Sequence, residues 1–384
     1  MKNWFTILFI IGAMFSCSQK EKKGEGKVIT VEVDKTSKIM LSDIFDRVDY
    51  VPLETVDSSL IGIVERFRLF NDKLCVLSNK SLMLFDKQTG RADLCISKLG
   101  NAPREYQSLY DAFVDRKTGE IEVLDMSGRK IQKYDMHGVY RKTQELPSMP
   151  FSFIKCGKND YWFYNNNMIS GTVKSELIHF DADHGQIVNE YFPIDVDLAK
   201  YFFVVEGNNF VDRGKDILFF CCPSNKIYLL KNELPPTVAY SVDFGRCKVP
   251  DEFYKRKFSD IVEFSTEANK RGYVYFINNF SGNQSYVQLS FFLDQKAFWS
   301  IYSVHDGTVH TGCILQDDLN SLNSFHLSSL NTLFAMDGGC LYFLISAEQF
   351  VEMCSGNDKF SKMLRDNNIN DQSNPLLVKC RFRK

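Results

Sequence analysis

From about residue 28 onward, the chain consists of short apolar runs that are broken by Gly, Asn and Asp. The runs have the length of β-strands, are rich in β-branched and aromatic residues, and are bounded by turn formers. Helical periodicity is rare, and it occurs in residues 250–258, 347–353 and 358–367. The pattern therefore predicts a nearly all-β body with short helical insertions near 250–260 and 347–367.

A strand that ends in an aromatic residue, followed by Asp and a Gly turn, recurs along this body. The aromatic positions are 85, 134, 180, 228 and 302, although the fourth member lacks the Gly. A unit of about 40–50 residues with four short strands is typical of a β-propeller blade. The long last step accommodates the helical insertion after Pro250. The spacing predicts a six-bladed β-propeller, with five and seven blades still open, and a β-sandwich is the alternative fold.

The two ends of the repeat must meet if the ring is to close. The last blade is expected within residues 320–384, and the N-terminal strands, at about 28–55, are expected to pair with it. No linker rich in Pro, Gly or Ser interrupts the body, which favours one closed domain over residues 28–384.

The N-terminus has the pattern of a targeting segment. A short positive head, Met1–Asn3, precedes the apolar run Trp4–Phe15, and Ser16 and Cys17 are followed by a polar run. This pattern is typical of a signal peptide, and the apolar run is shorter than the roughly 20 residues of a spanning helix. A buried N-terminal helix is the alternative.

The junction Met14-Phe15-Ser16-Cys17 resembles a bacterial lipobox, which Met14 and Phe15 fit loosely. We therefore expect a signal peptide over residues 1–16 and a lipidated, flexible tether over residues 17–27, with the lipid on Cys17 holding the protein on a membrane. Ordinary cleavage without lipidation is the alternative.

Composition narrows the function classes. Hydrophobic residues make up 44% of the 384 residues and charged residues 24%, so the chain can bury a core and is not disordered. The aromatic content of 14%, with 33 Phe, favours strands. The net charge is −2 and no basic stripe carries stacking aromatics, which argues against a nucleic-acid partner.

Ten cysteines follow Cys17, without a CxxC motif or the paired spacing of a zinc site. Most lie in apolar runs, where a free cysteine behaves as a small hydrophobe. We expect buried free thiols. Export would permit disulfides, but the sequence identifies no pair.

Three segments resemble a known family. Residues 45–55 (FDRVDYVPLET) resemble the opening motif of the six-bladed β-propeller lipoproteins that are abundant in Bacteroides and related bacteria. Residues 99–106 (LGNAPREY) resemble that family's G-x-G-P-x-E-Y signature, with Ala102 in place of the second Gly, and residues 373–377 (SNPLL) resemble its Asn-Pro close. The resemblance implies the fold and the compartment. Because most members have no assigned function, it implies little about activity.

The loop over residues 100–106 contains the sharpest local motif. Arg104 could clamp a carboxylate or phosphate, Glu105 adds a charge partner, and Tyr106 could stack on a sugar or a peptide. The alternative is a loop that joins neighbouring blades.

The Asn-rich stretches 164–167 and 277–280 follow strands and combine amides with aromatic residues. That mixture suits recognition of sugars or peptides, and the candidate binding residues are Asn166, Asn278 and Asn279. The alternative is turn formation, which Asn favours.

Motifs of catalysis and metal binding are not found. HExxH, GxSxG, P-loop and GxGxxG patterns are missing. Residues 181–185 (DADHG) lack the further ligands of a calcium loop, and residues 241–245 (SVDFG) match only the start of a sialidase Asp-box. We expect neither a metal nor a cofactor.

Our first functional hypothesis is a lipoprotein of the cell envelope, on the outer or inner membrane and facing the periplasm or the exterior. It would act as a binding or scaffolding propeller for a glycan, a peptide or an envelope protein. The alternatives are a glycan-active hydrolase or lyase with carboxylates at the channel mouth, and a structural subunit of an envelope complex. Convergent acids with an Arg or His at the mouth would favour the enzyme, whereas aromatics and amides would favour binding.

Overall fold

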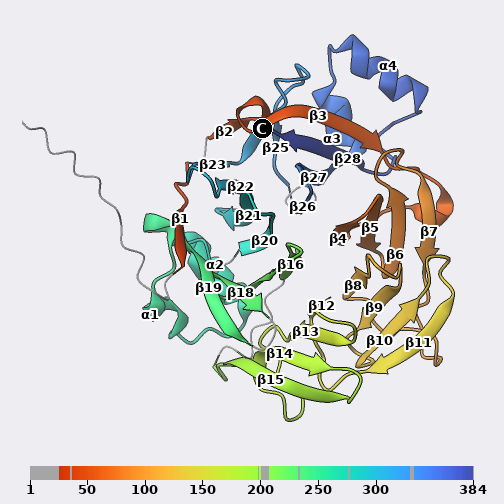
Figure 1. The fold of residues 1–384 in the computed structure, drawn as a ribbon. Helices are drawn as coiled ribbons and strands as arrows, with labels where there is room; N and C mark the ends of the chain where they lie inside the picture. Colours follow the sequence, from red (N-terminus) through yellow and green to blue (C-terminus); the bar gives the residue numbers. More distant parts are fainter. Residues whose placement is uncertain are drawn as a thin grey trace, which may run out of the picture.

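The strand-length runs fold into sheets that are arranged radially around one centre, as a β-propeller (Figure 1). The computed structural model describes residues 26–34, 37–197, 199, 207–231, 234–275, 277–328 and 333–383. The predicted signal peptide, Cys17 and the tether as far as residue 25 lie outside these residues.

Six sheets have four or more strands. From the innermost strand outward, the first sheet is β4 (Val64–Phe70), β5 (Lys73–Ser78), β6 (Ser81–Asp86) and β7 (Ala92–Ile96), and the second is β8 (Asp111–Val114), β9 (Ile121–Asp125), β10 (Lys130–Tyr134) and β11 (Tyr140–Glu145). The third is β12 (Ser152–Lys155), β13 (Asp160–Tyr164), β14 (Ser175–Asp181) and β15 (Gln186–Pro193), and the fourth is β16 (Phe210–Asp212), β17 (Ile217–Phe220), β18 (Lys226–Lys231), β19 (Leu234–Asp243) and β1 (Lys27–Thr30). The fifth is β20 (Ile277–Gly282), β21 (Tyr286–Leu293), β22 (Lys296–Ser303) and β23 (Val309–Gly312), and the sixth is β26 (Phe334–Asp337), β27 (Cys340–Ile345), β28 (Leu376–Phe382) and β3 (Phe45–Pro52).

A seventh sheet makes the prediction of six blades wrong, because the described strands form seven sheets. It consists of β2 (Lys38–Met40), β24 (Ile314–Gln316) and β25 (Phe325–His326). The repeat missed it because its strands have only two or three residues and lack the aromatic-Asp-Gly turn. The small sheet lies at the rim, where β2 contacts β23, whereas β4, β8, β12, β16, β20 and β26 contact one another in turn around the centre.

The aromatic residue of the repeat lies on the third strand of its sheet, as in β6, β10, β14, β18 and β22. The Asp that follows caps the turn: Asp86 Oδ1 accepts the backbone N–H of Gln88 at 3.0 Å and of Thr89 at 2.9 Å. Gly90 has a φ of +74°, and a Cβ there would lie 1.8 Å from the Pro52 carbonyl oxygen. The repeat is therefore a turn motif, which has a physical cause at each position.

Ring closure is confirmed for one N-terminal strand. β3 pairs antiparallel with β28, so the first and last parts of the chain share a sheet. The expectation was wrong for the other two, because β1 pairs parallel with β19 and β2 pairs parallel with β24.

The helical insertions occur near the predicted positions. They are α1 (Asp251–Tyr254), α2 (Ile261–Lys270), α3 (Ala347–Met353) and α4 (Asp358–Asp366), with short 3-10 turns η1 (Leu41–Asp43), η2 (Asp57–Ser59) and η3 (Gly245–Cys247). The sequence pattern missed α2 because it buries only Phe264 and Ala268. Among the described helices, none is both long and apolar enough to span a membrane.

The ten cysteines that follow Cys17 all belong to the described residues and are free thiols, and six of them are buried. The expectation of free thiols is therefore confirmed, whereas the expectation of burial is wrong for Cys95, Cys156, Cys247 and Cys340. Burial raises the pKa of the Cys75 thiol to about 12, which disfavours its reactive thiolate form.

Candidate functional site

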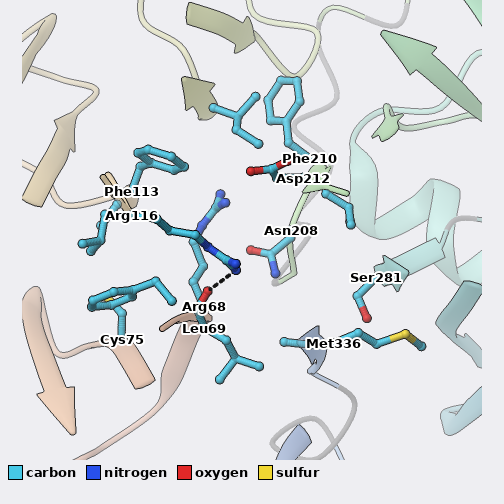
Figure 2. A pocket seen from close by; sticks show the side chains of 16 residues that line it. Arg68, Leu69, Cys75, Phe113, Arg116, Asn208, Phe210, Asp212, Ser281 and Met336 are labelled. Atoms are coloured by element: carbon cyan, nitrogen blue, oxygen red, sulfur yellow. Dashed lines mark hydrogen bonds between the residues drawn. The ribbon is translucent and has the colours of Figure 1, made fainter. Parts of the chain in front are cut away.

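A cavity of about 90 Å³ lies at the centre of the propeller (Figure 2). Each of the six innermost strands contributes to its lining. Phe70, Phe113, Ile154 and Phe210 supply apolar surface. The polar and charged lining residues are Arg68, Arg116, Asn208, Asp212 and Ser281.

The cavity opens toward one face of the ring. All the innermost strands begin at the face that carries the long connections and helices, which we call the loop face, and end at the face of the Asp-capped turns, the turn face. Arg116 follows the end of β8 and Asp212 is the last residue of β16. Arg116 and Asp212 therefore mark the mouth, at the turn face.

The loop-face end of the cavity is closed by a contact across the ring. The segment that precedes β16 reaches β4, where Asn208 Nδ2 donates to the Phe67 carbonyl at 3.5 Å. The buried Arg66 donates to the Gly207 carbonyl, and its Nε donates to the Tyr110 carbonyl at 2.8 Å. The Gly207–Asn208 backbone thus forms the floor of the cavity.

Most charges near the cavity are compensated. Arg68 forms a bidentate ion pair with the fully buried Asp111, with Nη2 2.7 Å from Oδ2 and Nε 3.1 Å from Oδ1. Asp111 also accepts the Phe153 N–H at 3.0 Å. These partners occupy both carboxylate oxygens of Asp111.

Arg116 and Asp212 at the mouth are less constrained. Arg116 is 49% exposed, and its Nη2 donates to the Leu69 carbonyl at 3.3 Å, the bond drawn in Figure 2. Asp337 lies 3.8 Å from Arg116 and is held more closely by Lys87, at 2.5 Å. Asp212 is the one carboxylate among the described residues that line the cavity.

Asn208 has an unmet hydrogen-bonding capacity. Its side chain is 8% exposed, and within the described parts of the chain no group donates to its Oδ1. Figure 2 shows this oxygen turned toward the middle of the cavity. A buried acceptor without a partner is costly, so the cavity favours a molecule that donates a hydrogen bond there.

The loop over residues 100–106 does not line the cavity. Tyr106 is fully buried, and its hydroxyl donates to the Lys80 carbonyl at 2.8 Å and accepts the Lys98 N–H at 3.0 Å. Arg104 lies over the Tyr140 ring, 5.4 Å from its centre. Glu105 folds back, and its Oε2 accepts the Ala102 N–H at 2.9 Å. These contacts hold the first two large sheets together.

The two Asn-rich stretches meet at the loop face. Asn167 Nδ2 donates to the Cys222 carbonyl at 3.4 Å, and Cys222 Sγ lies 3.8 Å from the Ile277 carbonyl. Asn166 accepts the Tyr164 hydroxyl at 3.1 Å. The structure therefore brings the stretches together through Cys222, although both are buried.

Neither Asn278 nor Asn279 is among the lining residues, and Asn279 lies beneath the cavity floor. Asn279 Oδ1 accepts the Phe334 N–H at 3.1 Å, which ties β20 to β26. A Cβ on Gly207 would lie 2.3 Å from Asn279 Nδ2, so the floor packs directly on this residue. Asn278 Nδ2 has no partner within the described residues.

Glu176 was missed by the sequence analysis. It is buried at the start of β14, where its Oε2 accepts the Asn167 N–H at 2.9 Å. Burial raises the pKa of this carboxyl to about 7. Its position gave no signal in the sequence, because one acidic residue at a strand start is usually exposed.

The cavity residues were also missed. A signal existed for the first of these strands, where Arg66 and Arg68 alternate with the apolar residues Phe67 and Leu69. Asn208, Arg116 and Asp212 gave none, because they come together only when separate blades close into a ring. Within the described residues, no cluster of three or more His, Cys, Asp or Glu could hold a metal ion.

The fold and the cavity define a β-propeller with a central cavity that is closed at one end. The chain belongs to the family described as a domain of unknown function (DUF4934), whose profile matches residues 26–381. No curated protein matches the sequence.

Two solved structures from Bacteroides are similar in fold. One is a protein of Bacteroides fragilis NCTC 9343 that is named as an inferred exported protein, with 15% identity, a TM-score of 0.70, and coverage of 93% of this chain and 100% of that chain. The other is a member of the duf4221 family from Bacteroides vulgatus ATCC 8482, with 8% identity, a TM-score of 0.55, and coverage of 88% and 97%. At these identities the likeness concerns the fold alone.

Proposed function

We propose that this protein is an exported β-propeller of the cell envelope that binds a ligand through its central cavity and catalyses no reaction. The observation that carries the proposal is the buried Asn208 Oδ1, which has no hydrogen-bond partner in the described part of the chain and faces a cavity with aromatic walls. Apolar walls with a few placed polar groups are typical of binding sites.

The set of acids at the cavity supports binding over glycan hydrolysis. Glycosidases of the common kind use two carboxyl groups that flank the scissile bond. Among the described residues, Asp212 is the only carboxylate in the lining, and the nearby Asp111 accepts hydrogen bonds from Arg68 and from backbone N–H groups.

A ligand screen tests the proposal. Glycans and peptides are added to the purified chain, and a ligand that binds only the folded state raises the melting temperature. We expect at least one ligand whose shift is lost in Arg116→Ala and kept in Arg141→Ala, an exposed arginine that pairs with Asp135 in a neighbouring turn. A ligand whose shift survives Arg116→Ala would place the site elsewhere.

The proposed location includes a lipid on Cys17, with the propeller on the outer or inner membrane. The N-terminal pattern supports export, and the similar Bacteroides fragilis protein is named as exported. Cell fractionation tests the anchor: Cys17→Ala should move the protein to the soluble fraction, whereas Cys95→Ala, at an exposed cysteine, should not. Membrane-bound Cys17→Ala would refute the lipid anchor.

A further inference from the structure

The size of the cavity limits what can enter it. A buried water needs roughly 10–15 Å³ by the same measure, so about 90 Å³ admits a small group and not a whole sugar ring or an aromatic side chain. The ligand must therefore insert one slender substituent and keep its bulk outside, at the mouth.

The walls and floor select a neutral amide for that substituent. Asn208 Nδ2 is directed to the Phe67 carbonyl, which leaves Oδ1 to accept an N–H from the cavity. Phe113, Ile154 and Phe210 offer apolar surface that suits a methyl group. Arg68 directs Nε and Nη2 to Asp111, and the neighbouring Arg66 directs its donors to the Tyr110 and Gly207 carbonyls. These donors are already engaged and do not offer a clamp for an anion.

The mouth, at the opposite end of the cavity from this floor, offers a hydrogen-bond donor, Arg116, and an acceptor, Asp212. Arg116 is half exposed and has further N–H groups beyond the one that reaches Leu69. Asp212 Oδ1 accepts the Gly214 N–H at 2.7 Å, and no cation lies within ion-pair distance of it in the described part of the chain. Sugar hydroxyls donate and accept at once, so they match a guanidinium and a carboxylate together.

We infer, on the basis of the proposed function, that the ligand is an N-acetylated amino sugar. Its acetamido group enters the cavity, with the N–H directed to Asn208 Oδ1 and the methyl group against Phe113 and Ile154. The ring stays at the turn face, where its hydroxyls contact Arg116 and Asp212. An amide on a flexible peptide side chain would use the floor but would leave Asp212 unpaired.

Titration calorimetry with three methyl β-glycosides tests this inference on the purified chain. The probes are those of N-acetylglucosamine, glucosamine and glucose, which share a ring and differ at one substituent. We expect the N-acetyl compound to bind at least tenfold more tightly than the other two. Equal affinities for all three would overturn the inference.

Two variants test the placement of the acetamido group. Arg116→Ala should weaken binding of the N-acetyl glycoside at least fivefold, while the matched Arg141→Ala should leave it unchanged. Ala335→Val narrows the cavity wall and should abolish the preference for the N-acetyl group. A preference that persists in both variants would contradict the assignment.

A glutamine-containing tripeptide separates this inference from the proposed function. Binding of the peptide, with loss in Arg116→Ala and without binding of the N-acetyl glycoside, would overturn the sugar assignment and keep the cavity as the site. If no probe and no compound of the wider screen binds, the proposed function itself fails.

Discussion

The Tyr106 hydroxyl joins backbone groups of the first large sheet to the loop that leads into the second. Tyr106→Phe keeps the ring but leaves the Lys98 N–H and the Lys80 carbonyl without this partner. We expect a loss of about 1–3 kcal/mol in the free energy of unfolding, measured by urea denaturation.

Tyr140→Phe is the matched control, because the Tyr140 hydroxyl bonds to the side chain of Thr143 at a half-buried position. It should cost less than Tyr106→Phe. If Tyr106→Phe also leaves ligand affinity unchanged, the loop acts as a connector. A reduced affinity at unchanged stability would restore it as a binding site.

The buried carboxyl of Glu176 should make the free energy of unfolding depend on pH. Its pKa in the folded protein, about 7, lies above the ordinary value of 4.5, so folding favours the protonated carboxyl. The stability it contributes is present below about pH 4.5 and is lost as the pH rises to about 7. Relative to wild type, Glu176→Gln should gain about 1–3 kcal/mol between pH 4.5 and pH 8.

Urea denaturation across this pH range measures the effect, and Glu145→Gln, at an exposed position, serves as the control. A difference between wild type and Glu176→Gln that stays constant from pH 4.5 to pH 8 would show that folding does not raise the pKa of this carboxyl.

Among single residues, the sequence indicated which side chains are unusual better than it indicated where they lie in the fold. It identified Tyr106 and Asn279 as unusual, and both are buried connectors that join sheets. It gave no sign of Asn208, because the contact of Asn208 with β4 spans 141 residues of chain and forms only across a closed ring.

Asn374 connects the two ends of the chain at the level of strands. Its Nδ2 donates to the carbonyls of Glu54 at 2.7 Å and Ser59 at 2.8 Å, and its Oδ1 accepts the Ile61 N–H at 2.9 Å. The Asn-Pro segment and the segment after β3 are therefore joined by hydrogen bonds beside the β3–β28 pair. We call this contact, between Asn374 and residues 54–61, the latch. Two motifs that the sequence showed separately are halves of one structural element.

Asn374→Ala should destabilise the protein by about 2–4 kcal/mol, because it leaves several buried backbone groups without partners. Thermal denaturation measures the loss. Asn370→Ala is the control, since the Asn370 side chain bonds locally in an exposed turn. Equal melting temperatures for the two variants would show that the latch contributes nothing.

The elements were predictable where their pattern was local. The aromatic-Asp-Gly turn located the third strands because Asp capping and a positive-φ Gly act within five residues. The parallel pairings of β1 and β2 were not predictable, because short strands at open edges depend on distant partners.

Over the whole molecule, the ring should fold as one unit. β28 lies between β27 and β3, so removing residues 376–384 breaks the sheet and separates the two ends of the chain. We expect this truncation to abolish the cooperative transition in calorimetry. Removal of residues 383–384 alone serves as the control. A truncated chain that still unfolds in one sharp transition would show that closure is dispensable.

The central claim is that the cavity in the ring is the ligand site, and the Asn208 side chain reports on it directly. In protein labelled with ¹⁵N-asparagine, the Asn208 amide signals can be assigned from their loss in Asn208→Asp. Titration with the tightest ligand of the screen should shift these signals in proportion to occupancy. Saturation of the protein with ligand while the Asn208 signals stay in place would contradict the claim.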